Sequence, residues 1–165
     1  MESIRALIFA SIVGFLALIT ATWLIMLAYM DLQASGTQVA MDQWAKHPNS
    51  LDVNGWEAIY MPLHEALRTT PDNPEYLELM GRLYRWKAYA LRGDVTAVRN
   101  ADQEALRYIQ HALTISPARP QLWAGVIDVK HALGQYDEDM QQAIQVAAEY
   151  GAWLPDVQRI IMQTG

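Results

Sequence analysis

Apolar residues follow one another without interruption near the start of the chain and recur every three to four residues later on. The first pattern, from Ala6 to Met30, is 25 residues without a charge. As a helix it would be about 37 Å long, against about 30 Å for the hydrocarbon core of a bilayer. The second pattern, from residue 36 onward, is typical of amphipathic helices and nowhere alternates as strands do. The sequence therefore predicts an all-α protein.

The periodic segments predict seven helices after the apolar run. Their expected bounds are residues 37–46, 55–69, 74–92, 101–116, 120–133, 137–150 and 155–162. Asn73 is expected to cap the third of them, with Pro74 at the first helical position, where its missing N–H costs nothing. Arg119 stands in the same place before Pro120 and is a poor cap, so that start is expected to be looser.

These patterns divide the chain into three parts. They are a cytoplasmic N-terminus with a transmembrane anchor (residues 1–31), a juxtamembrane segment with a short helix (residues 32–54), and a helical domain (residues 55–165). A cleaved signal peptide and a buried core helix are the alternatives to the anchor. The apolar run is too long for either, and "LQA" at residues 32–34 has Leu where a signal cleavage site needs a small residue.

The flanks of the apolar run predict its orientation. Arg5 precedes the run, and no Lys or Arg follows it before Lys46. Positive charge stays in the cytoplasm, so the helical domain is expected outside, in the periplasm of a double-membraned bacterium, with the anchor in the inner membrane. One face of the anchor carries small residues that would permit close packing of a partner helix, namely Ala10, Gly14, Ala17 and Ala21.

Composition narrows the chemistry. The chain has no cysteine, which excludes disulfides, thiolate zinc sites and thiol catalysis. Its net charge is −6. Nucleic acid is not expected as a partner, because phosphate contacts need a basic face.

Two passages of the helical part repeat one another at an offset of 46 residues. Apolar residues meet apolar residues and prolines meet prolines, as "HEALRTTP" and "QHALTISP" illustrate. The matched positions are Leu63, Ala66, Leu67, Pro71, Pro74, Leu77, Met80 and Leu83 with Ile109, Ala112, Leu113, Pro117, Pro120, Trp123, Val126 and Val129. The sequence therefore predicts an internal helix-turn-helix repeat.

The repeated segment resembles tetratricopeptide repeats. Their second helix ends in a small residue, Leu and then Pro, and the next helix carries a large residue, an apolar one, Gly and an aromatic. Leu77, Met80, Gly81 and Tyr84 fit this helix, whereas Ile127 stands where the second copy should have Gly. The resemblance implies a solenoid of helical hairpins, with about three helix pairs and a short final helix.

The period is 12 residues longer than the usual period of about 34. The extra residues lie between Tyr84 and Ala105, and residues 85–104 are expected to hold a loop-containing insertion specific to this protein. Trp86 and Tyr89 lie beside this insertion and are candidates for extra contacts.

A tetratricopeptide-like solenoid would have a concave groove lined by one face of each first helix. Such grooves bind peptides or partner proteins. The residues expected there are Glu75, Glu78, Arg82, Arg85, Gln121, Asp128 and His131. The alternative is a solvated face, since Glu78 and Arg82 are four residues apart on one helix and would satisfy each other.

Catalytic motifs are not found in the sequence. The four histidines, His47, His64, His111 and His131, form no HExxH pair, and no nucleophile elbow or phosphate-binding glycine loop occurs. Asp137, Glu138 and Asp139 suggest a cation site, but they also stand where the first turn of a helix favours negative charge. We therefore expect no enzyme activity, no metal and no cofactor.

The anchor, the domain size and the phrase "TPDNPEYLELMGRLYRWKAYAL" together resemble the VpsP-type proteins of bacterial exopolysaccharide gene sets. The likeness is concentrated in residues 61–92, with looser agreement over residues 101–123. It implies a membrane-anchored, non-catalytic scaffold or adaptor in exopolysaccharide biosynthesis or export, which binds partner proteins through its repeats. Two alternatives stay open. One is a periplasmic assembly or chaperone-like factor of the secretion-channel or cytochrome-maturation type, and the other is an accessory subunit of an integral membrane enzyme.

Overall fold

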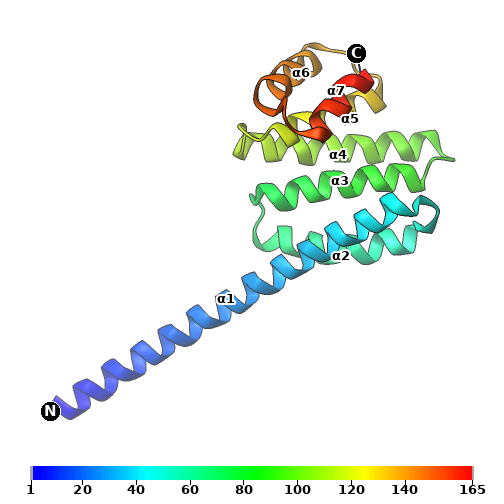
Figure 1. The fold of residues 1–165 in the computed structure, drawn as a ribbon. Coiled ribbons are helices and arrows are strands. Elements are labelled where there is room, and N and C mark those ends of the chain that lie inside the picture. The colour runs from blue at the N-terminus through cyan, green and yellow to red at the C-terminus, as the bar shows by residue number, and fades with distance from the viewer. Residues whose placement is uncertain (1, 165) are drawn as a thin grey trace.

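The described residues form helices joined by short turns, with no strand among them, which confirms the all-α expectation (Figure 1). The computed structural model describes the backbone of residues 2–164, and the side chains of residues 1–8, 30, 33, 156 and 163–165 lie outside the description. The elements are α1 (Glu2–Lys46), a short 3-10 helix (Pro48–Ser50), α2 (Val53–Thr69), α3 (Pro74–Ala90), α4 (Val95–Ile115), α5 (Pro120–Leu133), α6 (Glu138–Gly151) and α7 (Pro155–Thr164).

Helix α1 runs unbroken for 45 residues, from the apolar segment into the helical domain. The helix expected to begin at residue 37 is therefore the last part of α1, and that expected start is wrong. Gly36 lowers the local helix propensity by only about 1 kcal/mol. No proline interrupts the run, and the Ser35 hydroxyl donates to the Asp31 carbonyl at 2.9 Å. The residues beyond Gly36 are also packed against the domain.

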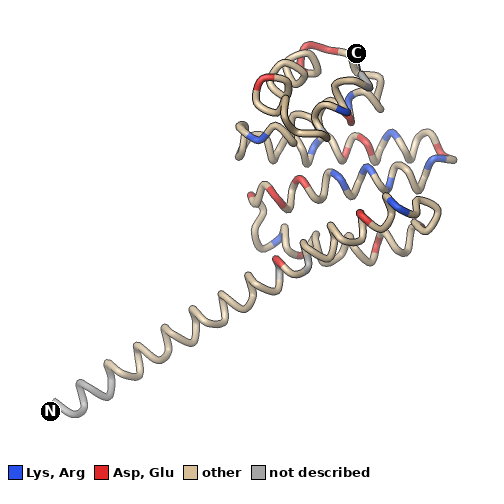
Figure 2. The backbone as a smooth tube through the Cα atoms, viewed as in Figure 1, with Lys and Arg blue, Asp and Glu red and all other residues tan. Residues whose placement is uncertain are grey.

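The first part of α1 is long and apolar enough to cross a membrane. Its large side chains are exposed from Phe9 to Leu32. Figure 2 shows no charged position along its described length until the helix approaches the domain at Asp31. Arg5, on which the predicted orientation depends, lies among the residues whose side chains are outside the description.

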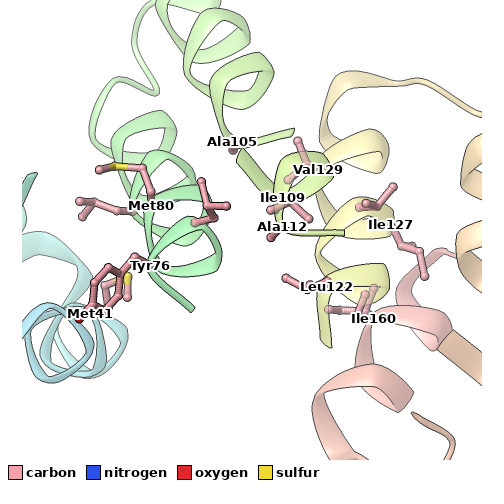
Figure 3. Close-up of a cluster of buried hydrophobic side chains, with 14 of the residues drawn as sticks. Met41, Tyr76, Met80, Ala105, Ile109, Ala112, Leu122, Ile127, Val129 and Ile160 are labelled. Carbon is pink, nitrogen blue, oxygen red and sulfur yellow. The ribbon is translucent and has the colours of Figure 1, made fainter. Parts of the chain in front are cut away.

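The last part of α1 packs on α2 and α3. Ala34, Thr37, Met41 and Trp44 are buried, at alternating spacings of three and four residues that place them on one helix face. Figure 3 draws Met41 next to Tyr76 of α3 within the buried cluster. One helix therefore provides both the apolar segment and a wall of the domain.

The remaining helices form a stack in chain order. Each of α1 to α6 contacts the next helix along the chain. The odd-numbered helices also contact one another in order, α1 with α3, α3 with α5 and α5 with α7. Within the described part of the chain, α2, α4 and α6 make no such contacts among themselves. The odd-numbered helices thus form one layer and the even-numbered helices another.

Helix α4 is longer, and the turn between α3 and α4 is shorter, than expected. Helix α4 begins at Val95, six residues before the predicted start, and the turn takes only residues 91–94. Asp94 caps α4, because its carboxylate accepts from Thr96 N at 2.9 Å and Ala97 N at 3.1 Å. The extra residues of the long period therefore lengthen the two helices instead of forming a loop. All other helix ends lie within two residues of the expected bounds.

The two proline-containing helix starts differ as predicted. The Asn73 side chain accepts from Glu75 N at 2.9 Å and from Tyr76 N at 3.3 Å. Arg119 makes no capping hydrogen bond to α5.

The α3–α4 contact is close at Gly81. A Cβ atom placed there would lie 2.6 Å from Ile109 Cγ1 and 3.2 Å from the Ala105 carbonyl oxygen. Ala105 and Ala112 are fully buried beside Ile109, and Figure 3 shows Ile109 and Ala112 near Leu122 of α5. Small residues at these positions let α3 and α4 approach closely enough for Ile109 to reach α5 as well.

Candidate functional site

A concavity of about 630 Å³ opens where the odd-numbered helices meet. Its polar lining comes from Gln38 and Asp42 of α1, Glu78, Arg82 and Arg85 of α3, Gln121 and Asp128 of α5, and Arg159 of α7. Its apolar lining includes Trp86, Ile109, Leu122, Leu154, Val157 and Ile160. A hollow with an apolar lining and several polar groups at its walls is the usual form of a binding site.

Helices α1 and α3 run in the same direction along the concavity. Tyr76 near the start of α3 donates to Asp31 of α1 at 2.6 Å, while Trp86 near the end of α3 meets Trp44 of α1, with ring centroids 6.0 Å apart. Burial and the hydrogen bond to Asp31 raise the pKa of Tyr76 to about 12, because both favour the protonated hydroxyl that donates to Asp31.

Two ion pairs align α3 with α5 in the same way. At the α3 start, Glu78 meets Arg119. Further along α3, Arg85 meets Asp128 of α5. The walls formed by α1, α3 and α5 are therefore parallel, and the concavity extends along their common axis.

Arg85 joins three helices at one side of the concavity. Its Nε donates to Asp128 Oδ2 at 2.9 Å, and its Nη1 donates to Asp102 Oδ1 of α4. The Asp102 side chain is 3% exposed, and the Arg85 side chain is 29% exposed. Burial lowers the pKa of Arg85, but attraction to Asp128 and Asp102 outweighs it and the net direction is upward. Arg85 is thus a permanently charged structural link.

Glu78 is committed to Arg119 instead of Arg82. Glu78 Oε2 is buried and lies 2.9 Å from Arg119 Nη2, as an ion pair whose angle falls short of hydrogen-bond geometry. The alternative of a solvated face, in which Glu78 and Arg82 satisfy each other, therefore fails at this pair. Arg82 and Asp42 are exposed at the concavity and make no hydrogen bond or ion pair with any described residue.

Five of the seven residues expected in a groove line this concavity together. They are Glu78, Arg82, Arg85, Gln121 and Asp128. Glu75 lies instead at a shallow hollow beside the α2–α3 turn. His131 pairs with the Tyr136 hydroxyl at 3.0 Å, away from the concavity.

Sequence reasoning missed the contributions of α1 and α7 to the concavity. Gln38 and Asp42 are four residues apart, next to the buried face of α1. They would have been found if the last part of α1 had been assigned as the first inner helix. Arg159 comes from α7, whose contact with α5 joins residues distant in sequence and leaves no local signal.

The aromatics beside the long hairpin connect it to α1. Trp86 meets Trp44 edge-on and Tyr89 at 5.9 Å, and the Arg92 guanidinium lies 4.6 Å from the Tyr89 ring centroid. Trp86 also lines the concavity. The length of α3 and α4 therefore places Trp86 beside the end of α1 and Arg85 beside Asp102.

The small residues of the apolar segment, Ala10, Gly14, Ala17 and Ala21, are exposed in the described chain. A Cβ atom at Gly14 would have nothing within 4 Å.

Two of the three carboxylates of "YDEDMQ", Asp137 and Asp139, bind a lysine. Lys130 of α5 is buried, and its Nζ donates to Asp137 Oδ2 at 2.6 Å and to Asp139 Oδ2 at 3.3 Å. Asp137 also caps α6 by accepting from Met140 N at 3.1 Å. These side chains therefore have a structural role at the α5–α6 junction.

The described residues contain no group of three or more His, Asp and Glu side chains arranged to hold a metal ion. His64 packs on the Tyr60 ring at 5.2 Å, and His111 Nε2 lies 3.1 Å from Asp72 Oδ1. Each therefore has a neighbour that accounts for its position in the fold.

Comparison with models of known protein families and with curated protein sequences finds no match to this chain.

Proposed function

We propose that this protein is a membrane-anchored, non-catalytic scaffold or adaptor that binds a partner protein in the concavity between α1, α3, α5 and α7. The observation that carries the proposal is the pair of uncommitted charges, Arg82 and Asp42, on facing helices of a hollow with an apolar lining. Charges that satisfy one another within a fold stabilise it, whereas uncommitted charges beside apolar surface favour recognition of a partner.

The packing order supports a tetratricopeptide-like solenoid. In such a solenoid the first helix of each hairpin lines the concave side, and here the concavity is lined mainly by the odd-numbered helices. The pairs would be α1 with α2, α3 with α4, and α5 with α6, followed by α7. The close approach at Gly81 stands where the repeat pattern has its glycine.

The setting we propose is exopolysaccharide synthesis or export, at the inner membrane of a double-membraned bacterium. The support is the resemblance of residues 61–92 to VpsP-type proteins and the apolar part of α1. With Arg5 on the cytoplasmic side, the helical domain would lie in the periplasm.

Charge reversal at Arg82 tests the proposal. We expect Arg82→Glu to abolish co-purification of the partner from mild detergent, because the reversed charge repels what the guanidinium attracts. Arg107→Glu is the matched control, since Arg107 is exposed on α4 and pairs only locally with Glu104. Arg85 is unsuitable for this test because its substitution would disturb the fold.

Proteins that co-purify with the parent chain and with Arg107→Glu, but not with Arg82→Glu, would support the concavity as the binding site. Identification of glycosyltransferases or a polymerase among them would support the polysaccharide setting, whereas cytochrome-assembly proteins would favour the assembly-factor alternative. Equal recovery with all three chains would remove the concavity from consideration.

A further inference from the structure

The concavity has a fixed direction relative to the apolar part of α1. Its end nearest that segment is marked by the Tyr76–Asp31 hydrogen bond and the Glu78–Arg119 ion pair. Its far end is marked by Trp86 against Trp44 and by Arg85 with Asp128. Because α1, α3 and α5 are parallel, a segment lying along the concavity would continue the direction of α1.

The concavity also lies at a fixed distance from the outer end of the apolar segment of α1. Gln38 and Asp42 follow Met30, the last residue of the uncharged run, by 8 and 12 residues. At 1.5 Å per residue, the concavity begins about 12 to 18 Å beyond that point along α1. A tilt that fits the run of about 37 Å into a core of about 30 Å reduces this distance, measured along the membrane normal, to about 10 to 15 Å. The headgroup layer takes about 5 to 8 Å of it, so the concavity opens just outside the headgroups.

Neither the direction nor the height depends on a flexible linker. Helix α1 is continuous through Gly36, and its last part is held by buried Met41 and by the Trp44–Trp86 contact. A partner segment must therefore reach this height beside the membrane.

From this geometry, and resting on the proposed function, we infer that the occupant of the concavity is the juxtamembrane segment of a membrane-spanning partner that crosses the bilayer beside α1. That segment would place an acidic side chain at Arg82, a basic side chain at Asp42, and apolar side chains toward Trp86 and Leu154, the partly exposed apolar residues of the lining. Tethering both chains to one membrane makes the binding effectively intramolecular, with an effective concentration on the order of millimolar, so a short segment suffices.

Photo-crosslinking in membranes tests the inference with the full chain. A photoreactive amino acid is introduced at Gln121, which is exposed at the concavity, and at Gln145 as a control, which is exposed on α6 and does not line the concavity. We expect crosslinks specific to position 121, and the crosslinked partner peptide should lie within about 12 residues of an apolar span, the length of helix needed to reach this distance from the membrane.

The possible results separate the inference from the proposed function. A crosslinked peptide from a protein without a membrane span, or from a region distant from the span, would overturn the inference and leave the proposed function standing. Equal labelling from positions 121 and 145 would overturn both.

A seven-residue helical insertion between Met30 and Asp31 provides a second test. Seven residues add two turns, which raises the domain by about 10 Å and nearly preserves the helix face. We expect the crosslink from position 121 to be lost or to move about seven residues further from the partner's span. An unchanged crosslinked peptide at unchanged yield would show that the occupant is not held at a fixed height, and the inference would fail.

Discussion

At the scale of single residues, the charges of this protein divide into committed and uncommitted groups. Arg85 is committed to Asp102 and Asp128, and Glu78 to Arg119. Arg82 has no partner among the described residues. The division shows which positions can be changed to test binding without disturbing the fold, because buried pairs affect stability far more than exposed charges.

Arg85→Met should lower the free energy of unfolding by about 3 to 5 kcal/mol, because it leaves the buried Asp102 carboxylate without its partner. Urea denaturation measures the change. Adding Asp102→Leu to this variant should recover much of the loss by removing the orphaned charge. Arg68→Met, which breaks an exposed pair with Glu65, should cost no more than about 1 kcal/mol. A loss for Arg85→Met as small as this would contradict the structural role of Arg85.

The Lys130–Asp137 pair predicts a pH dependence. The hydrogen bond from Lys130, followed by that from Met140 N, lowers the pKa of Asp137 below 3.8. The ionised Asp137 therefore contributes to the free energy of unfolding above pH 3.8. This contribution is lost as the pH falls through the pKa that Asp137 has in the folded state. Burial lowers the pKa of Lys130, but the hydrogen bonds to Asp137 and Asp139 outweigh burial, and the pKa is raised above 10.5. The lysine contribution is complete below pH 10.5 and is lost at higher pH.

Asp137→Asn should therefore reduce the fall in unfolding free energy below about pH 4, where the parent chain loses this contribution. Urea denaturation at a series of pH values measures it. Asp139→Asn is the comparison, since the Asp139 side chain is 71% exposed and its oxygen is 3.3 Å from the lysine, and its effect should be smaller. If the unfolding free energy falls equally below about pH 4 in the parent chain and in Asp137→Asn, the Lys130–Asp137 pair is not the source of this pH dependence.

At the scale of helices, the α3–α4 hairpin is the element that departs from an ordinary repeat. Its helices are 17 and 21 residues long, and the added turns bring Trp86 to α1 and Asp102 to Arg85. Away from the turn, α3 and α4 pack closely because Gly81 and Ala105 leave room for the Ile109 side chain. The hairpin thus joins the end of α1 to α5 through one continuous packing surface.

Gly81→Ala should destabilise the protein, although alanine is the better helix former by about 1 kcal/mol. The new Cβ would lie 2.6 Å from Cγ1 of the buried, β-branched Ile109 side chain and 3.2 Å from the Ala105 carbonyl oxygen, and neither atom can move away cheaply. We expect a net loss of about 1 to 2 kcal/mol in urea denaturation. Gly93→Ala is the control, since nothing lies within 4 Å of its Cβ position, and it should be neutral or slightly stabilising. Equal stability of the two variants would show that the α3–α4 contact is looser than described.

At the scale of the whole molecule, the continuity of α1 fixes the orientation of the helical domain relative to the apolar segment. The buried face from Ala34 to Trp44 fixes the helix to α2 and α3, and the Tyr76–Asp31 bond fixes it at the domain edge. A domain joined in this way moves with the apolar helix, whereas a domain on a glycine-rich linker would sample many orientations.

Gly36→Pro should break this connection. Proline removes one intrahelical hydrogen bond and clashes with the carbonyl four residues earlier, at a cost of about 3 kcal/mol. Because the chain has no cysteine, spin labels can be attached at Thr22→Cys and Arg99→Cys alone. The distance distribution between them should broaden with Gly36→Pro and stay narrow with Gly36→Ala, whose added methyl group meets nothing within 4 Å. A narrow distribution in both variants would mean that α1 is not the rigid link.

The sequence by itself determined the helices and most of their ends. Periodicity located every helix of the domain, and Asn73 and Arg119 indicated which starts are capped. These features are local, because they depend on residues within one or two turns of each other. The same local reasoning missed the start of α4, because Asp94 was not considered as its cap.

Only the tertiary structure decided which charges pair and which helix lines the concavity with α3 and α5. Glu78 takes Arg119 in preference to Arg82 four residues away, and its side chain is only 19% exposed there. Burial strengthens such a pairing relative to an exposed one on the same helix. The role of α1 as both apolar segment and concavity wall likewise depends on packing against α2 and α3, which follow it in sequence. These choices are non-local, so periodicity and spacing cannot contain them.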